Sequence, residues 1–350
     1  MDATAQHVKD FCKDLVNDEK SHEIVHWEDT LISKESISTK VRRSVKKVVK
    51  CFAKGNNKNN EEEKEVVKNN GYKRLIALGD IHGDHDHLIS ILRHAKLIDE
   101  ENNWIGTDAI FVQLGDLIDR GGETRKVYDT ILKLREQAKE KGGEVDVILG
   151  NHEVLALQGN HLYTSLDDFD SFGGVEALEE EFGPEGRFGK FIRQEMNITM
   201  IINDSLFVHG SITPEHIPEG LDNLNQVTRE ILLDTPTVDE LYDLFLNGVS
   251  HPIFANKIFD TGSGPICSKK LTNGDEREIC SILEETLRLT NTKRMIVGHN
   301  VQFYGKIRTK CNNKLIMIDI GISRCIGGGY YGYLEMLLDK NEIWARYFKK

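Results

Sequence analysis

Five short polar segments of this chain combine aspartate, asparagine and histidine with glycine. In chain order they are Gly79-Asp80-Ile81-His82-Gly83, Gly115-Asp116-Leu117-Ile118-Asp119-Arg120-Gly121, Gly150-Asn151-His152-Glu153, His209-Gly210 and Gly298-His299-Asn300. Carboxylate oxygen and imidazole nitrogen suit borderline-hard divalent metals, and the segments contain no thiolate that would select a softer ion. The set predicts a site for two divalent metal ions, with manganese, iron or zinc as candidates and manganese favoured in vitro.

Each of these segments follows a short apolar run that we expect to be a β-strand. With a sixth run near the C-terminus, the expected strands are Arg74–Leu78, Ile110–Leu114, Val145–Leu149, Leu206–Val208, Met295–Val297 and Leu315–Ile318. Ligands of open α/β sheets bind beyond the carboxyl ends of the strands, so the five segments are expected to meet at one rim. A single Asp-x-His match would be weak evidence for a metal site. Five such segments, each after an expected strand, are strong evidence for one.

Two helical stretches separate the first three expected strands. Residues 86–95 and 123–139 are each long enough to connect parallel strands, which predicts a βαβαβ unit. Asp84 is a plausible N-cap of the first helix, and His85 and His87 are then expected to be solvated helix residues. The region from residue 154 to residue 204 is expected to be mostly helical.

The five segments resemble, in this order, the motifs of the phosphoprotein phosphatase family of calcineurin-like metallophosphoesterases. The match spans roughly residues 73–320. The segments Asp260–Pro265 and Asp319–Gly328 are similar to the Shewanella-like protein phosphatases, a branch of that family. The resemblance implies an α/β fold of four layers, with a central β-sandwich flanked by helices. It also implies a catalytic domain over residues 71–350, with a helical insertion around residues 154–204.

The resemblance assigns a role to each polar residue. The first metal would be held by Asp80, His82 and Asp116, and the second by Asp116, Asn151, His209 and His299, with Asp116 bridging. A metal-bridging hydroxide would then attack the phosphorus atom in line.

The remaining roles concern the substrate. His152, oriented by Asp119, would donate a proton to the leaving group. Arg120 would bind the phosphoryl oxygens through its planar guanidinium, together with Asn151. The branch commonly has a second arginine where this chain has Lys269, so Lys269 is a candidate phosphate contact.

These roles predict a metal-dependent protein phosphatase that acts on phosphotyrosine, phosphoserine or phosphothreonine. One alternative is a diadenosine tetraphosphatase or another small-molecule phosphoesterase, because the same metal ligands serve both classes. Another alternative is a non-catalytic scaffold, against which the complete ligand set argues. Fold and motif alone do not decide the substrate.

The composition excludes several other classes. The 350 residues carry a net charge of −12, which argues against nucleic-acid binding. No apolar run approaches the length of a transmembrane helix, and no secretory signal is visible, so a cytoplasmic location is expected. The six cysteines form no C-x-x-C pair and are expected to be thiols in a reduced compartment.

Residues 1–70 differ from the rest of the chain and are expected to be an extension and linker. Between Lys40 and Lys58 there are eight basic residues and no acidic one. Five apolar residues recur there at helical spacing, namely Val41, Val45, Val48, Val49 and Phe52. Residues 40–58 therefore favour a basic amphipathic helix that docks on the acidic body of the protein, with contact to a membrane surface or a partner as the alternative.

Overall fold

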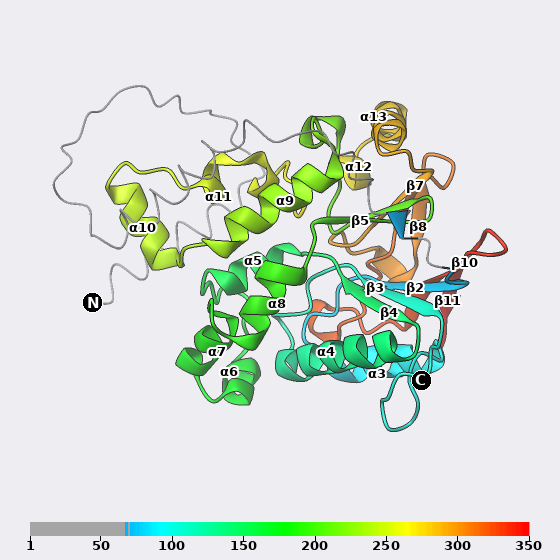
Figure 1. Ribbon diagram of the computed structural model, residues 1–350, viewed down its shortest axis with the longest axis horizontal. Helices are drawn as coiled ribbons and strands as arrows, with labels where there is room; N and C mark the ends of the chain where they lie inside the picture. Colours follow the sequence, from blue (N-terminus) through cyan, green and yellow to red (C-terminus); the bar gives the residue numbers. More distant parts are fainter. Residues whose placement is uncertain (1–66, 69–70, 350) are drawn as a thin grey trace.

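Two β-sheets lie face to face at the centre of the protein. The structure, a computed structural model, describes residues 67–68 and 71–349 (Figure 1). The described strands are β1 (Val67–Lys68), β2 (Arg74–Leu78), β3 (Ala109–Gln113), β4 (Glu144–Val147), β5 (Thr199–Ile202), β6 (Ser205–Val208), β7 (Arg294–Val297), β8 (Arg308–Lys310), β9 (Leu315–Met317), β10 (Gly332–Leu337) and β11 (Glu342–Tyr347). One sheet has the order β1-β5-β6-β7-β9-β8, and the other has the order β11-β10-β2-β3-β4.

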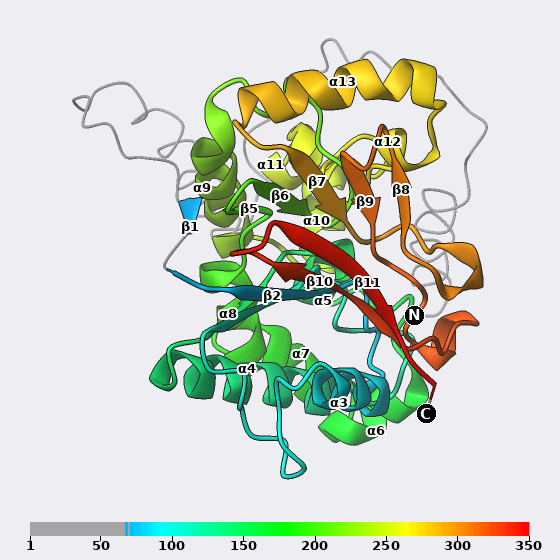
Figure 2. The ribbon, with the colours of Figure 1, turned by 90° about the vertical axis from the view of Figure 1, so that its right-hand side faces the viewer.

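Helices cover the outer faces of the two sheets. The described α-helices are α3 (His85–His94), α4 (Thr124–Glu140), α5 (Asn151–Leu157), α6 (Leu166–Phe172), α7 (Val175–Phe182), α8 (Arg187–Glu195), α9 (Gly220–Leu233), α10 (Val238–Leu246), α11 (Pro252–Ala255), α12 (Lys270–Asn273) and α13 (Glu276–Leu289). Figure 2 shows the layers in profile, with α13 above one sheet and α3 and α4 below the other. The predicted β-sandwich flanked by helices is confirmed.

The central strands are buried on both faces. In β2, Leu75 and Ala77 point into the space between the sheets, while Ile76 and Leu78 point outward to the helices. β3 repeats this alternation. Parallel strands that are covered on both sides are apolar throughout, which explains the continuous apolar runs in the sequence.

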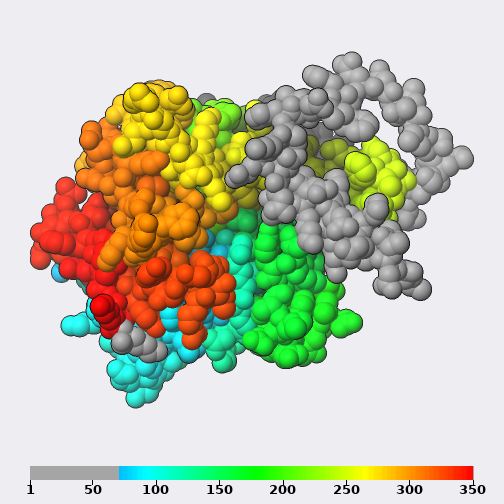
Figure 3. All heavy atoms as spheres, turned by 180° about the vertical axis from the view of Figure 1, so that it is seen from behind, coloured from blue at the N-terminus to red at the C-terminus, as the bar shows by residue number. Residues whose placement is uncertain are grey.

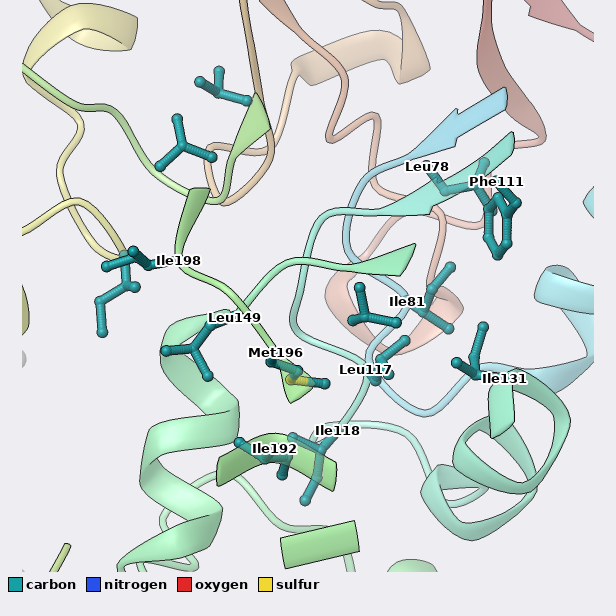
Figure 4. Packing of buried hydrophobic residues seen from close by; sticks show 14 of the residues in the cluster. Leu78, Ile81, Phe111, Leu117, Ile118, Ile131, Leu149, Ile192, Met196 and Ile198 are labelled. Carbon is teal, nitrogen blue, oxygen red and sulfur yellow. The ribbon is translucent and has the colours of Figure 1, made fainter. Parts of the chain in front are cut away.

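Apolar residues inside the polar segments anchor the loops that follow β2 and β3. Ile81, Leu117 and Ile118 are at most 1% exposed. Figure 4 shows these side chains in one cluster with Leu78 and Phe111 of the strands. The packing of these three side chains therefore fixes the backbone on which the neighbouring aspartate and histidine residues stand.

The first part of the fold is the predicted βαβαβ unit. β2, β3 and β4 pair in parallel, and α3 and α4 begin and end within one residue of the predicted helices. The expected strand Val145–Leu149 ends earlier, at Val147, because Ile148 forms only an isolated bridge with Asn197.

Five strands were not predicted from the sequence, namely β1, β5, β8, β10 and β11. The helices of the region 154–204 end at Glu195, and residues 199–202 form β5 instead of continuing the expected helical stretch. β10 pairs antiparallel with both β2 and β11, far from β2 in the sequence. These strands are short, and no polar segment of the kind described above follows them. Hydrophobic periodicity alone does not distinguish such short runs from other buried segments, so the sequence did not predict them.

Two expectations about single side chains are wrong. His87 is not solvated; it is 4% exposed, and its ring nitrogens lie 2.7 Å from the Ile322 carbonyl oxygen and 2.8 Å from the Tyr331 hydroxyl. Cys280 and Cys311 are not thiols, because they form a disulfide. The two cysteines are 31 residues apart, so only the packing of α13 beside β8 and β9 brings them together.

Residues 1–66 lie outside the described residues. The basic amphipathic helix expected within residues 40–58 therefore lies outside them as well. No helix among the described residues is long and apolar enough to cross a membrane.

Asp84 joins the start of α3 to the segment that follows β9. Its carboxylate caps α3 by accepting from the His87 amide, as the sequence predicts. It also accepts from the Arg324 amide and from two nitrogens of the Arg324 guanidinium, at 2.8–2.9 Å. Burial opposes ionisation of this carboxyl, but the bonds from Arg324 lower its pKa below the usual value.

We expect Asp84→Ala to lower the free energy of unfolding by about 1–3 kcal/mol, because a helix cap and a charged hydrogen-bond pair are lost together. Since the folded-state pKa is lowered, this contribution is present above the usual value of 3.8 and is lost as the pH falls through the folded-state pKa. Denaturant unfolding of both proteins at neutral pH measures the loss. Asp339→Ala, at an exposed position in the turn between β10 and β11, is the control, and equal effects of both substitutions would contradict this role of Asp84.

Candidate metal centre

The loops that follow the strands of both sheets converge on Asp116. The amides of Ile81 and His82 donate to the Asp116 carbonyl oxygen at 3.1 and 2.9 Å, which joins the first two polar segments. The Gly298 amide donates to the His209 carbonyl oxygen at 2.8 Å, which joins the last two. The expected meeting of the five segments at one rim is therefore what the structure forms.

These loops contain several residues with a left-handed backbone. Five non-glycine residues of the predicted site have φ between 44° and 71°, namely His82, Asp116, Asp119, Arg120 and His299. Each such left-handed residue costs about 1–3 kcal/mol and persists only where the surrounding structure holds it. Ile81, Leu117 and Ile118 lie in the same loops, and their packing in the core holds the backbone in these conformations.

Glycine precedes the ligands because the carboxylates approach the backbone closely. A Cβ atom on Gly150 would lie 2.3 Å from Asp116 Oδ1, and one on Gly298 would lie 2.7 Å from Asp80 Oδ1. Neither contact is possible for a larger residue. The two glycines are therefore required by the position of the carboxylates.

His82 and Asp80 face Asp116 on one side of the site. His82 Nε2 lies 3.9 Å from Asp80 Oδ2 and 3.8 Å from Asp116 Oδ2. The other ring nitrogen, Nδ1, lies 3.0 Å from the Ile118 carbonyl oxygen. A carbonyl can only accept, so Nδ1 carries the proton and Nε2 keeps a free lone pair toward the carboxylates.

His209, His299 and Asn151 face Asp116 on the other side. His209 Nε2 lies 3.3 Å from Asp116 Oδ2 and 3.1 Å from Asn151 Oδ1. Its Nδ1 lies 2.5 Å from the Leu114 carbonyl oxygen, so Nδ1 carries a proton and Nε2 is the nitrogen that faces Asp116 and Asn151. Donor atoms of Asp116, His209 and His299 lie within 4.8 Å of one another.

The donor set fits two divalent cations that share Asp116. A second group of donor atoms within 4.8 Å consists of His82, Asp116 and His152, so Asp116 belongs to both groups. Asp319 Oδ2 is buried without a hydrogen-bond partner, and burial with the nearby Asp319 charge raises the pKa of Asp80 well above its usual value. A carboxyl with a raised pKa favours its neutral form, and a bound cation would restore the charged form.

The imidazole pKa values also fit metal binding. Burial lowers the pKa of His82 to about 4 and that of His299 to about 3, so both imidazoles are neutral at neutral pH, the form that can bind a metal. Burial alone would lower the pKa of His209, but Asp116 and Asp80 raise it to about 10. The carboxylates that favour a proton on His209 would equally attract a divalent ion in its place.

His152 lies beside the ligands and is held by Asp119. His152 Nδ1 lies 2.7 Å from Asp119 Oδ2, and its Nε2 lies 3.9 Å from Asp116 Oδ2. Burial opposes a charge on this ring, but Asp116 and the hydrogen bond with Asp119 raise the pKa of His152 above its usual value. Thr164 donates to the other carboxylate oxygen of Asp119 at 2.9 Å, so Asp119 is fixed on both sides.

Two cationic side chains face the same centre from the surface. Arg120 is exposed, and its charge lowers the pKa of His82 and opposes charging of His152. Lys269 is also exposed, and its charge lowers the pKa of His299. Both are positioned to meet an anion that approaches the carboxylate and imidazole groups.

Three residues of the site carry no role in the sequence-based prediction. Glu153 is fully buried and accepts the amides of Asp116, Leu117 and Gly150 at 2.8–2.9 Å, which fixes the loop of the shared ligand. In the sequence, only the position of Glu153 directly after His152 indicated that it belongs to the site. Asp319 lies beside Asp80, at the end of β9.

Tyr163 is the third of these residues, and it braces the exposed Arg120. The Arg120 guanidinium carbon lies 4.8 Å from the centre of the Tyr163 ring, within the range of a cation–π contact. The Arg120 amide also donates to the Tyr163 carbonyl oxygen at 2.8 Å. No spacing in the sequence indicates these contacts, because Tyr163 lies 43 positions beyond Arg120.

The model of the family described as calcineurin-like phosphoesterase matches residues 73–287, and the chain belongs to this family. Its curated relatives include Shewanella-like protein phosphatase 2 of Arabidopsis thaliana, which is 28% identical in an alignment of 311 positions that covers 76% of this chain and 76% of the relative. Shewanella-like protein phosphatase 1 of Plasmodium berghei is 31% identical over 286 residues, or 80% of this chain and 75% of the relative. The predicted resemblance to the Shewanella-like branch is confirmed.

Solved structures agree with this assignment. The cold-active protein-tyrosine phosphatase of a psychrophilic Shewanella species is 27% identical, with a TM-score of 0.67 over 79% of this chain and 78% of that chain. A protein serine/threonine phosphatase from Saccharomyces cerevisiae is 15% identical, with a TM-score of 0.52 over 79% of this chain and 80% of that chain. The second likeness concerns the fold alone.

We expect Glu153→Gln to lower the affinity for Mn²⁺ about 10–100-fold, which is the usual effect of removing a group that orients a metal ligand. The amide replaces one acceptor oxygen with a donor that faces the backbone amides of Asp116 and Gly150. Calorimetric titration of the metal-free protein with Mn²⁺ measures the change. Glu179→Gln, on exposed α7, is the matched control, and an unchanged affinity in Glu153→Gln would refute the orienting role.

Proposed function

We propose that this protein is a dinuclear-metal protein phosphatase that hydrolyses phosphomonoesters of phosphotyrosine or of phosphoserine and phosphothreonine. The observation that carries the proposal is that Asp116 belongs to two groups of potential metal donors, with His82 and His152 in one group and His209 and His299 in the other. His152 is also hydrogen-bonded to Asp119. The family membership and the printed names of the relatives support the substrate class. The likeness to a protein-tyrosine phosphatase supports phosphotyrosine among the substrates.

In this proposal, Asp80, His82 and Asp116 would hold the first metal, and Asp116, Asn151, His209 and His299 would hold the second. Two bound divalent ions supply Lewis acidity and lower the pKa of coordinated water toward about 7. Manganese is our choice for assays. Imidazole and carboxylate donors accept it as they accept iron and zinc.

The chain's own residues bind and orient the substrate and move one proton. Arg120 presents a planar pair of donors to the phosphoryl oxygens, and the Tyr163 ring limits its orientations. Asn151 and Lys269 contribute further contacts to the phosphoryl group, with Lys269 acting as a point charge. His152 donates the proton on Nε2 to the leaving oxygen, because Asp119 occupies its Nδ1.

Residues 71–350 form the catalytic domain in this proposal, with the helices between residues 154 and 204 as an insertion. We retain a cytoplasmic location as a prediction from the sequence. The disulfide between Cys280 and Cys311 does not support the reduced compartment on which that prediction partly rests.

Phosphate release from phosphotyrosine and phosphoserine peptides with added Mn²⁺ tests the proposed activity. We expect Asp116→Asn to lower kcat at least about 10²-fold, because the shared ligand holds both ions and a metal-assisted step contributes several kcal/mol. Asp108→Asn, the same substitution in an exposed turn, should keep full activity. Hydrolysis of dinucleotide polyphosphates but not of phosphopeptides would establish the small-molecule alternative, and inactivity of the wild-type protein toward both would favour a scaffold.

The role of His152 predicts a change in pH dependence. Because Asp119 raises the pKa of His152, Asp119→Asn should move the basic limb of the kcat/KM profile to lower pH. Activity toward phosphoserine should fall about 10²-fold or more, and activity toward 4-nitrophenyl phosphate should fall less, since a good leaving group needs little protonation.

Asp167→Asn, at an exposed carboxylate near the same loop, is the control for this experiment. An unchanged basic limb in Asp119→Asn, or an equal loss toward both substrates, would contradict the assignment of His152 as the acid.

A further inference from the structure

The outer face of α10 exposes three large apolar side chains. Tyr242, Phe245 and Leu246 are 37%, 62% and 58% exposed, and their spacing of three and four residues puts them on one side of the helix. The adjoining side of the helix faces the core, because Leu241 and Leu244 are buried. The apolar surface of α10 therefore extends beyond the part that the core covers, which leaves its outer part available to a further partner.

The helices that precede and follow α10 in the sequence also expose large apolar side chains. Leu233 at the end of α9 is 56% exposed, and Phe254 of α11 is 64% exposed. Figure 3 shows α10 (yellow-green) at the periphery of the molecule. We call Leu233, Tyr242, Phe245, Leu246 and Phe254 the α10 face.

The α10 face is also acidic. Asp239 and Asp243 are exposed, one helical turn apart, and neither forms an ion pair with a described residue. α10 itself contains no basic residue. A ligand for this face should therefore combine apolar side chains with positive charge.

Another acidic helix shows that charge alone does not make such a face. α7 carries four glutamates, but its Leu178 and Phe182 are about 1% exposed. Val175 is its single exposed large apolar residue. α7 therefore offers charge without an apolar surface, which makes it a suitable control.

The chain contains a segment with the complementary composition. Residues 40–58 hold eight basic residues and no acidic one, with apolar residues at helical spacing. The described part of the chain from residue 73 onward carries an excess of acidic residues, with 31 basic against 44 acidic in the full sequence. Opposite charge and matching apolar stripes favour association of the segment with the α10 face.

The connection is long enough for the end of the segment to reach Leu233, on the α9 side of the α10 face. β1 pairs with β5, and Asn225 of α9 hydrogen-bonds to Thr199 of β5, so the chain enters the fold beside the middle of α9 (Figure 2). From Asn225 to Leu233 the helix rises about 12 Å at 1.5 Å per residue. The eight residues 59–66 span at most about 26–29 Å when extended, which exceeds that distance by a wide margin.

We propose that the α10 face binds the basic segment 40–58 of the same chain. The acidic side chains Asp239 and Asp243 pair with lysine and arginine of the segment, and its valines and phenylalanine cover Phe245 and Leu246. This proposal does not depend on the phosphatase activity. Docking of this kind holds an N-terminal extension on the body of the enzyme through surface charge, so it weakens as the salt concentration rises.

Hydrogen exchange of the full-length protein tests the contact at the backbone amides of residues 40–58 and 238–246. One variant reverses the charge of the segment, with Arg42, Arg43, Lys46 and Lys47 each changed to Glu. A second variant reverses the charge of the α10 face, with Asp239→Lys and Asp243→Lys. We expect each variant to exchange about fivefold faster or more at both regions, and we expect the combined variant to regain protection because the charges again match.

The control variant is Glu176→Lys with Glu180→Lys on α7, which should leave both regions unchanged. Unchanged exchange of β2 and β3 in every variant shows that the fold is intact. Equal exchange of α10 in the wild-type protein and the segment variant would overturn the proposal, and so would a combined variant that stays unprotected.

Two other occupants of the α10 face would also be detected. Protection that rises with protein concentration and persists in the segment variant would assign the face to a second copy of the chain. Loss of binding to phosphatidylserine vesicles in the segment variant, without any change at α10, would assign residues 40–58 to a membrane surface. Either result would overturn docking within the chain.

Discussion

The burial of several carboxylates at one point is the constraint on which the rest of the structure depends. Asp80, Asp116, Glu153 and Asp319 are all at most 2% exposed. Buried charges of one sign are unstable unless donors or cations compensate them. Backbone amides supply part of the compensation, since Asp80, Asp116 and Glu153 accept amides of His299, His152 and Leu117 respectively. The remaining charge makes the centre a binding site for cations.

This constraint explains the form of the surrounding loops. To aim backbone amides and imidazole nitrogens at the carboxylates, five residues take left-handed conformations, and glycines stand where a Cβ would collide with a carboxylate. The free energy that such a backbone costs is offset by packing, because Ile81, Leu117 and Ile118 insert into the core beside the strands. The candidate metal centre and the hydrophobic core are therefore parts of one arrangement, because the loops and their polar side chains depend on the packing beneath them for their positions.

The groups that would meet a substrate are held less tightly than those that would hold the metals. Arg120 is exposed and is steadied by the Tyr163 ring, and Lys269 is exposed on the other side of the centre. A lysine there provides charge without the planar geometry of a second arginine. The same metal ligands serve several classes of phosphoesterase, so the chemistry of this rim, not the metal centre, decides which phosphoester is accepted.

Much of this protein is determined by its sequence alone. The apolar runs predict the βαβαβ unit, and the polar residues placed after them identify the five loops, because strand ends and glycine turns are local features. The tertiary structure decided the features that depend on contacts between residues far apart in the sequence. β10 joins the sheet beside β2, the disulfide links Cys280 to Cys311, and Tyr331 and the Ile322 carbonyl bury His87. Glu153, Asp319 and Tyr163 likewise acquire their contacts only when the chain folds, since a side chain's partners across a fold leave no periodic signal in the sequence.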